Sequence, residues 1–202
     1  MRNKRSKSNI ILISLIIIIM FTLWFTGIIG LLFNGMAYIA NNSKEFTEKG
    51  HIISGEYSIS INLNDLKSNI GKELYNDGES EIYVSWINNT GSINSGGYSI
   101  GFRSSGQYSL NSATLVSGAH HETVDDNSFS TNMTAKMTTR YQDKIYNSEV
   151  YSTSGLNYKD GDDFAFYIFP YEAYDNGEVS LNEKGIVEIS IKNLYKNIWI
   201  KN

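Results

Sequence analysis

Three aspartates grouped around one glycine are the residues with the clearest potential for metal chemistry. Asp160, Asp162 and Asp163 flank Gly161. Carboxylate oxygens are the ligands that a hard cation such as calcium prefers, and a glycine lets the backbone bend so that several oxygens can converge. The spacing is not that of an EF-hand loop, because no glutamate stands at its closing position. The sequence therefore offers Asp160, Asp162 and Asp163 as a candidate calcium site, with an ordinary acidic hairpin loop as the alternative.

A second cluster of metal-ligand types is His120-His121-Glu122. Neighbours on a strand point to opposite faces, so only His120 and Glu122 can share one metal there. A zinc site needs at least three protein ligands, and His51 is the one other histidine in the chain. The cluster therefore fits a polar loop or a strand end better than a metal site.

Signatures of catalysis are scarce. Glycoside hydrolysis needs two carboxyl groups flanking a cleft, and the acids of this chain lie mainly in predicted turns. The sequence has no phosphate-binding loop with a lysine and no His-Glu-x-x-His. It has no cysteine, which excludes thiol catalysis, zinc–thiolate sites, iron–sulfur clusters and lipid attachment through an N-terminal cysteine. An extracellular hydrolase that uses loop carboxylates stays open only as an alternative.

Aromatic residues give a different kind of signal. The chain has 14 tyrosines, 9 phenylalanines and 3 tryptophans. Exposed Tyr and Trp side chains provide rigid, amphipathic contact area for sugars or protein partners. The same residues are also common strand formers, so ordinary packing within a sheet explains them equally well.

The elements that must position these residues are mainly strands. Apolar and polar residues alternate with a period of two in most of residues 55–202, and Gly, Asn and Asp cluster between the alternating runs. A short helix is predicted over 65–75, behind a possible Asp65 cap. Strands are predicted over 57–63, 81–87, 98–103, 107–116, 129–141, 144–152, 163–171 and 185–191, with a possible last strand over 194–202. This pattern predicts an all-β domain over 55–202, an antiparallel β-sandwich or a jelly roll.

A long apolar stretch precedes this domain. Residues 10–40 contain no charged residue and no histidine. A bilayer core of about 30 Å is crossed by roughly 20 apolar residues in a helix, so this stretch predicts a single transmembrane helix. Four basic residues and no acid precede it, which places residues 1–9 in the cytoplasm and the following domain outside. Residues 41–54 are polar and predict a short juxtamembrane stalk.

The apolar stretch can be a retained signal anchor or a removed signal peptide. Gly35 and Ala37 fit the small residues that precede a cleavage site, with the cut after Ala37. The apolar core is longer than that of a signal peptide, roughly 7–15 residues, which favours a retained anchor.

Charge narrows the possible partners of the outer part. All 21 acidic residues lie after residue 40 with 13 of the 17 basic ones, so this part has a formal charge of −8. Such a surface repels phosphate backbones, and nucleic acid is therefore an unexpected partner. We expect a single-pass membrane protein whose outer domain has a binding or structural role at the cell envelope, toward a protein or a cell-wall glycan.

Overall fold

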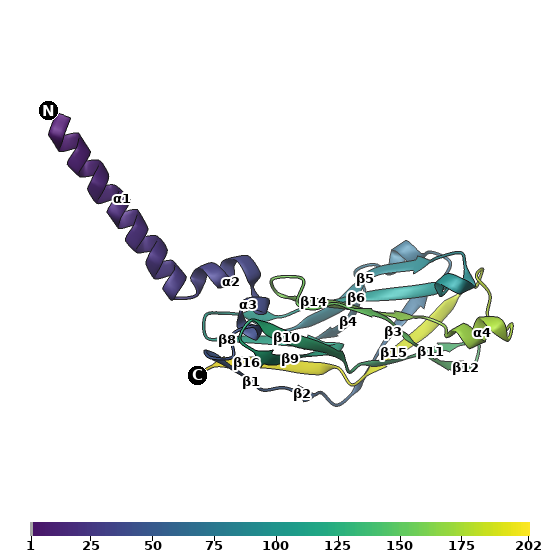
Figure 1. Ribbon diagram of the computed structural model, residues 1–202. Coiled ribbons are helices and arrows are strands. Elements are labelled where there is room, and N and C mark those ends of the chain that lie inside the picture. Colours follow the sequence, from purple (N-terminus) through teal and green to yellow (C-terminus); the bar gives the residue numbers. More distant parts are fainter. Residues whose placement is uncertain (1) are drawn as a thin grey trace.

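The structure is a computed structural model that describes residues 2–202, with side chains from residue 9 onward (Figure 1). Antiparallel strands account for 46% of the chain, which confirms the predicted all-β class. The helices are α1 (Arg2–Phe25), α2 (Ile28–Asn34), α3 (Met36–Ala40) and α4 (Tyr171–Asp175), with two 3-10 helices, η1 (Leu66–Asn69) and η2 (Ile93–Ser95). The strands are β1 (Phe46–Glu48), β2 (His51–Ile52), β3 (Glu56–Asn62), β4 (Glu73–Asn76), β5 (Glu81–Asn89), β6 (Tyr98–Ser105), β7 (Gln107–Tyr108), β8 (Ser112–Ser117), β9 (Ala119–Asp125), β10 (Ser128–Met133), β11 (Lys136–Tyr141), β12 (Lys144–Asn147), β13 (Val150–Thr153), β14 (Gly161–Tyr167), β15 (Ile186–Lys192) and β16 (Tyr195–Lys201).

Two sheets supply the residues of the larger core. One has the order β12-β11-β15-β3 and the other β13-β14-β6-β5-β4. Because successive side chains of a strand point to opposite faces, every second side chain of each sheet points inward. Examples are Ile61 and Ile189 from the first sheet and Phe102 and Phe166 from the second. All four are buried. We call this cluster the distal core, because it lies at the end of the molecule away from α1 (Figure 1).

A smaller core lies at the end next to the helices. The sheet β1-β16-β8-β7, with β2 also paired to β16, and the hairpin β9-β10 surround it. Its buried members come from α3, β1, β8 and β16 and from the segment before β14: Met36, Ile39, Ala40, Phe46, Ala113, Leu115, Leu156 and Trp199. We call this cluster the proximal core. Trp199 has no exposed surface, so β16 is anchored there by its largest side chain.

Two long segments pass from one core to the other. The predicted strand over 129–141 forms as β10 and β11, because the N–H groups of Thr134 and Ala135 both bond to the carbonyl of Gly118. Two residues opposite one are a β-bulge, which bends the strand and increases its twist. Between β15 and β16, Asn193 adopts a left-handed conformation with φ of 59°. Each segment therefore changes sheet partners across a break of two residues.

The other local predictions have mixed outcomes. Five strand predictions are confirmed, and each observed end lies within two residues of the predicted one: 57–63, 81–87, 98–103, 185–191 and 194–202. The helix over 65–75 is wrong: η1 ends at Asn69, and Gly71 with φ of 84° turns the chain into β4. The predicted strand over 144–152 is divided into β12 and β13, and that over 107–116 into β7 and β8. Strand β9 and helix α4 were not predicted.

The prediction of one continuous helix over 10–40 is wrong. The chain forms α1, α2 and α3, separated at Gly27 and Gly35, whose φ values are 77° and 55°. Glycine adopts such left-handed conformations without the steric cost of a Cβ, and a left-handed residue ends a helix. Of the residues described, no single helix meets the length and hydropathy criteria for a membrane span, whereas the pair Asn9–Phe25 and Ile28–Asn34, bent by 68°, meets them together.

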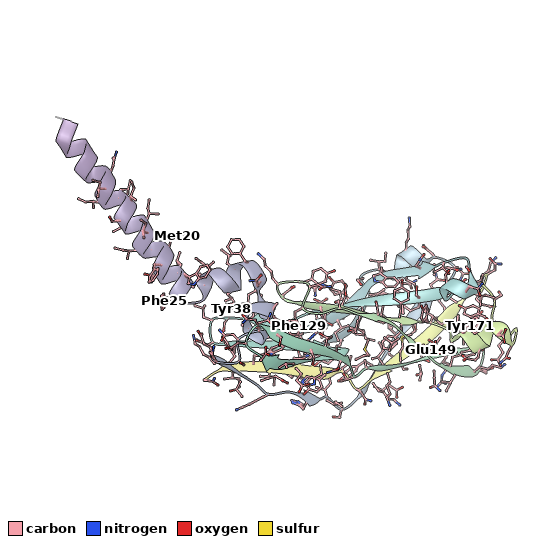
Figure 2. The ribbon with its side chains drawn as sticks, viewed as in Figure 1. Met20, Phe25, Tyr38, Phe129, Glu149 and Tyr171 are labelled. Atoms are coloured by element: carbon pink, nitrogen blue, oxygen red, sulfur yellow. The ribbon has the colours of Figure 1, made fainter. Side chains whose placement is uncertain are left out.

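The segment expected to be a stalk belongs to the β structure. Within 41–54, β1 and β2 pair antiparallel with β16, and Phe46 is buried in the proximal core. Helix α3 lies in the same core, although its residues were expected to be in the bilayer. By contrast, the apolar side chains of α1 project freely, as Figure 2 shows for Met20 and Phe25, which are 55% and 74% exposed. The folded domain therefore begins at α3.

Alkaline pH is expected to weaken the distal end of the domain through Tyr174. Burial raises the pKa of Tyr174 to about 12, and its hydroxyl oxygen accepts a hydrogen bond from the Tyr98 N–H at 3.0 Å. An unfolded tyrosine ionises near pH 10. The contribution of the buried, neutral Tyr174 hydroxyl to stability is therefore complete below about pH 10, and it is lost as the pH rises toward about 12. Urea unfolding across this range should show a shallower decline for Tyr174→Phe than for the wild type. Equal slopes for the variant and the wild type would show that ionisation of Tyr174 does not cause the loss of stability.

Candidate functional site

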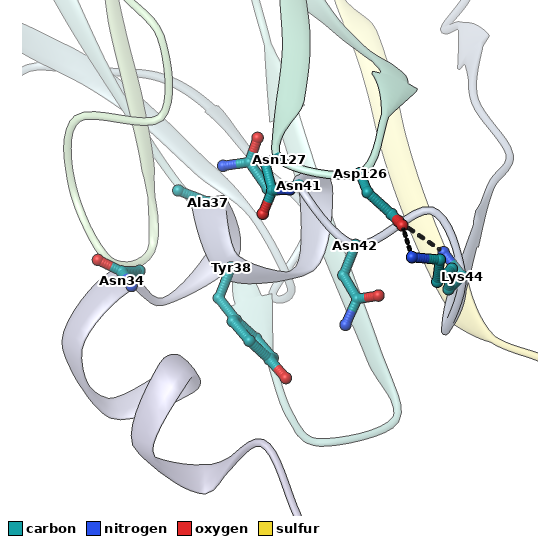
Figure 3. A pocket seen from close by; sticks show the side chains of 8 residues that line it. All are labelled: Asn34, Ala37, Tyr38, Asn41, Asn42, Lys44, Asp126 and Asn127. Carbon is teal, nitrogen blue, oxygen red and sulfur yellow. Dashed lines mark hydrogen bonds and ion pairs between the residues drawn. The ribbon is translucent and has the colours of Figure 1, made fainter. Parts of the chain in front are cut away.

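A polar pocket lies where the N-terminal helices meet the β domain (Figure 3). Its volume is about 530 Å³. We call it the junction pocket, and its lining residues are Asn34, Ala37, Tyr38, Asn41, Asn42, Lys44, Asp126 and Asn127. They come from the end of α2, from α3, from the turn before β1 and from the β9–β10 turn. Two segments far apart in the sequence therefore form the pocket together.

A backbone contact fixes the two segments against each other. The N–H of Asn127 donates to the carbonyl of Asn41 at 2.7 Å. Asn127 is left-handed, with φ of 77°, a conformation that asparagine tolerates better than most residues. The hydroxyl of Thr123 also donates to the carbonyl of Ala40 at 2.9 Å. The hairpin β9-β10 is thus bonded to the C-terminal end of α3.

The charges at the rim of the junction pocket neutralise each other. Lys44 forms an ion pair with Asp126, and the Ser43 hydroxyl donates to the same carboxylate at 2.8 Å. The hydrogen bond from Lys44 lowers the pKa of Asp126, and the same bond raises the pKa of Lys44. Both groups are therefore ionised at neutral pH, and the pair adds no net charge to the pocket.

Three carboxamides in the pocket keep their hydrogen-bonding groups free. Within the described part of the chain, the side chains of Asn34, Asn41 and Asn127 make no hydrogen bond, whereas the Asn42 side-chain oxygen accepts one from the Glu45 N–H at 3.2 Å. A carboxamide offers two N–H donors and an oxygen with two acceptor positions. The pocket can therefore bind a ligand that both donates and accepts hydrogen bonds.

An apolar groove continues from the junction pocket along the bend between α1 and α2. Its volume is about 400 Å³, and it shares Asn34 and Tyr38 with the pocket. We call it the bend groove, and its other lining residues are Trp24, Gly27, Ile29, Gly30 and Phe33. Trp24 and Phe33 are 70% and 71% exposed. The ring of Tyr38 stands at the boundary between the polar and the apolar part.

Glycines allow the close packing that shapes both cavities. A Cβ at Gly30 would lie 2.3 Å from the Tyr38 ring, so the ring can rest on α2 only because this residue has no side chain. A Cβ at Gly35 would lie 2.0 Å from the carbonyl oxygen of Lys159, which accepts a hydrogen bond from the Met36 N–H at 2.8 Å. The helices therefore dock on the loop before β14 at a position that only glycine fits.

The structure gives the three aspartates of the candidate calcium site different partners. Asp160 pairs with Arg103, whose guanidinium also lies 3.6 Å from the centre of the Tyr158 ring. Asp162 is fully buried, and Asp163, next to it on β14, points to the other face and accepts a hydrogen bond from the Tyr158 hydroxyl at 3.3 Å. Among the described residues, no group of three or more His, Cys, Asp or Glu side chains has the arrangement of a metal site. Calcium binding stays a prediction that titration followed by thermal melting tests.

Asp162 is instead the centre of a buried polar network. Its Oδ2 lies 2.7 Å from the Nε2 of His121 and accepts a hydrogen bond from the Ser117 hydroxyl at 2.5 Å. The Nδ1 of His121 lies 3.0 Å from the hydroxyl of Thr131. His121, Ser117 and Asp162 have no exposed surface, so the network joins β8, β9, β10 and β14 beneath the surface and does not face a substrate.

The remaining histidine of the sequence cluster also has a partner within the fold. The Nε2 of His120 lies 2.7 Å from a carboxylate oxygen of Glu48 on β1, and its ring stacks on Tyr195 with 4.2 Å between centroids. Glu122, the other residue on that face of β9, is exposed. The structure therefore pairs His120 with Glu48, while Glu122 faces solvent.

A row of aromatic rings crosses the outer face of the β13-β14-β6-β5-β4 sheet. Tyr151 on β13 lies between Trp86 on β5 and Tyr167 on β14, with centroid distances of 5.5 and 5.1 Å. The indole of Trp86 covers Gly101, where a Cβ would lie 2.1 Å from the indole nitrogen. Trp86 and Tyr167 are half-buried and Tyr151 is 46% exposed. The row offers a second, flatter contact surface.

No family model matches the chain, and neither a curated protein nor a solved structure is significantly similar to it. No sequence signal predicted the junction pocket, since asparagine is frequent throughout the chain and nothing local brings residue 127 to residue 41.

Proposed function

We propose that the protein is a membrane-anchored, extracytoplasmic β-sandwich with a binding role at the cell envelope. The bent pair α1–α2 is the anchor, and the domain from α3 onward is held outside the membrane. The four basic residues before the apolar stretch support this orientation, because basic residues next to a membrane segment stay on the cytoplasmic side.

One observation carries the proposal: α1 is exposed and apolar, yet the chain continues through the short helix α2 into α3, which is buried in the domain. The apolar side chains of α1 from Ile10 to Phe25 are mostly more than half exposed, which is costly in water and favourable in lipid. Met36 and Ile39 of α3 have no exposed surface. The anchor is therefore connected to the domain through the packed side chains of α3 and not through a flexible stalk.

The packing of α3 in the domain favours a retained anchor over a cleaved one. A cut after Ala37 would separate Met36 from the proximal core and would divide α3. Such a cut would also leave Leu115 and Trp199 without part of their packing partners. The mass of the mature protein measures which form exists.

Binding is the activity that the accessible surfaces favour. The junction pocket has three uncommitted carboxamides, and the outer sheet face has exposed aromatic area. Of the eight residues that line the pocket, Asp126 is the one acid, and it is paired with Lys44. Hydrolysis by two carboxylates requires a second acid within reach, so we favour binding over catalysis.

Membrane fractionation tests the proposal directly. In wall-free cells that express the full chain, we expect the protein to stay in the membrane during alkaline carbonate extraction and the outer domain to be digested by added protease. The double variant Ile17→Lys, Met20→Lys places two charges on α1 at a cost of roughly 2.5–3.5 kcal/mol each at the centre of a span, and it should be released. The control Ile145→Lys, at an exposed site on β12, should stay. Extraction of the wild type by carbonate, or a domain that protease reaches only after lysis, would contradict the proposal.

A further inference from the structure

We propose that the junction pocket and the bend groove together bind a single glycolipid, with its glycosyl headgroup in the pocket and the upper part of an acyl chain in the groove. This inference rests on the proposed function, and it adds that within the bent anchor α1 lies in the bilayer core while α2 lies at the outer surface of the bilayer. It adds a ligand class to the site.

A polar and an apolar cavity adjoin each other at this place. The two cavities share Asn34 and Tyr38, so one molecule can occupy both. The pocket side presents carboxamides, and the groove side presents Trp24, Ile29 and Phe33. Tyr38 lies at the boundary, and a tyrosine suits this place because its ring is apolar and its hydroxyl is polar. An amphiphile has the same division.

The polar groups of the junction pocket favour a particular kind of headgroup. The free carboxamides of Asn34, Asn41 and Asn127 can each donate and accept, which matches the hydroxyl groups of a sugar. Anionic headgroups need an unpaired cation or converging N–H groups, and Lys44, the cation of the pocket, is already neutralised by Asp126. The chemistry therefore favours a neutral, polyhydroxylated headgroup over a phosphate.

The bend groove favours a lipid over a free glycan. The bend groove is formed partly by Trp24, the next-to-last residue of α1, and it opens beside the exposed apolar surface of that helix. A free sugar would leave this apolar groove in contact with water, whereas an acyl chain would fill it and continue into the bilayer. The position of the groove beside α1 therefore favours a glycosyl group that is attached to a lipid.

Lipid selectivity in nanodiscs tests the inference with the full chain. The probes are discs of phosphatidylcholine alone and phosphatidylcholine discs that contain a minor fraction of either diglucosyl diacylglycerol or phosphatidylglycerol. After gentle release, native mass spectrometry measures the lipids that remain bound. We expect diglucosyl diacylglycerol to be enriched on the protein roughly tenfold relative to its share of the disc, as two or three added hydrogen bonds would give.

Matched variants assign the selectivity to the pocket. Asn34→Ala combined with Asn127→Ala should reduce the enrichment by roughly tenfold. The control Asn176→Ala removes an exposed carboxamide at the opposite end of the domain and should retain full enrichment. Thermal melting followed by circular dichroism checks that all three proteins are folded.

Several outcomes would overturn the inference. Equal retention of all three lipids, preference for phosphatidylglycerol, or unchanged enrichment in the double variant would each do so. Binding of the free diglucoside as tight as that of the lipid would make the ligand a soluble glycan instead. A chain that enters the discs without selectivity overturns this inference alone, while a chain that does not enter them overturns the proposed function as well.

Discussion

Replacing Asp162 by alanine is expected to lower the free energy of unfolding by about 3–5 kcal/mol, because it leaves buried partners without their acceptor. His121 and Ser117 both bond to the Oδ2 of Asp162, and none of the three side chains has exposed surface. A buried polar group that loses its partner cannot turn to water, so the full desolvation cost remains. Urea unfolding of the full chain in a mild detergent measures the change.

Asp163 is the matched control for this experiment. It is the next residue on β14, it is only half-buried, and its side chain makes one long hydrogen bond, to Tyr158. Asp163→Ala should therefore cost less than about 1 kcal/mol. Equal effects at the two positions would mean that the buried network does not stabilise the fold as described.

Removing α3 is expected to have a similarly large effect. A fragment that starts at Asn41 lacks Met36 and Ile39, which are fully buried in the proximal core, and should be less stable than a fragment that starts at Gly35 by at least about 4 kcal/mol. Deletion of either side chain alone opens a cavity beside Trp199, and each such change typically costs about 2–5 kcal/mol. Chemical unfolding of the two fragments in the same buffer gives the comparison.

Ile39→Ala in the longer fragment separates packing from chain length. It should reproduce about half of the loss, because it removes one of the two large side chains and leaves the helix in place. If the fragment from Asn41 were as stable as the longer one, α3 would not contribute to the folded domain. The proposal that packed contacts of α3 connect the anchor to the domain would then be wrong.

The fold class followed from the sequence because it depends on a local signal. Alternation such as that of Val187, Ile189 and Ile191 predicts a strand and its inward face without any knowledge of the partner strand. The uncharged composition of 10–40 likewise predicted helix. It did not predict where the helix ends, since Gly27 and Gly35 are tolerated within a span and become breaks only through contacts with Tyr38 and Lys159.

The site could not be predicted because its residues meet through non-local pairing. The register of β9 against β10 places Asn127 in a turn that reaches Asn41, and neither residue has a distinctive neighbourhood in the sequence. The aspartates around Gly161 had a distinctive pattern, but the alternation of β14 sends Asp162 inward to His121 and Asp163 outward. A predicted strand over 119–125 would have been the one available hint that His121 faces the interior.

The pairing of β1 with β16 has a consequence for the biogenesis of the protein. β16 is the last strand along the chain, it runs between β1 and β8, and it brings Trp199 to the side chains of α3. If the chain is exported with the N-terminal helix first, as proposed, the proximal core cannot be completed until β16 has been translocated. Contacts this distant in sequence form slowly. A chain that lacks β16 would therefore expose the apolar side chains of the proximal core, which in the proposed arrangement lie next to the membrane.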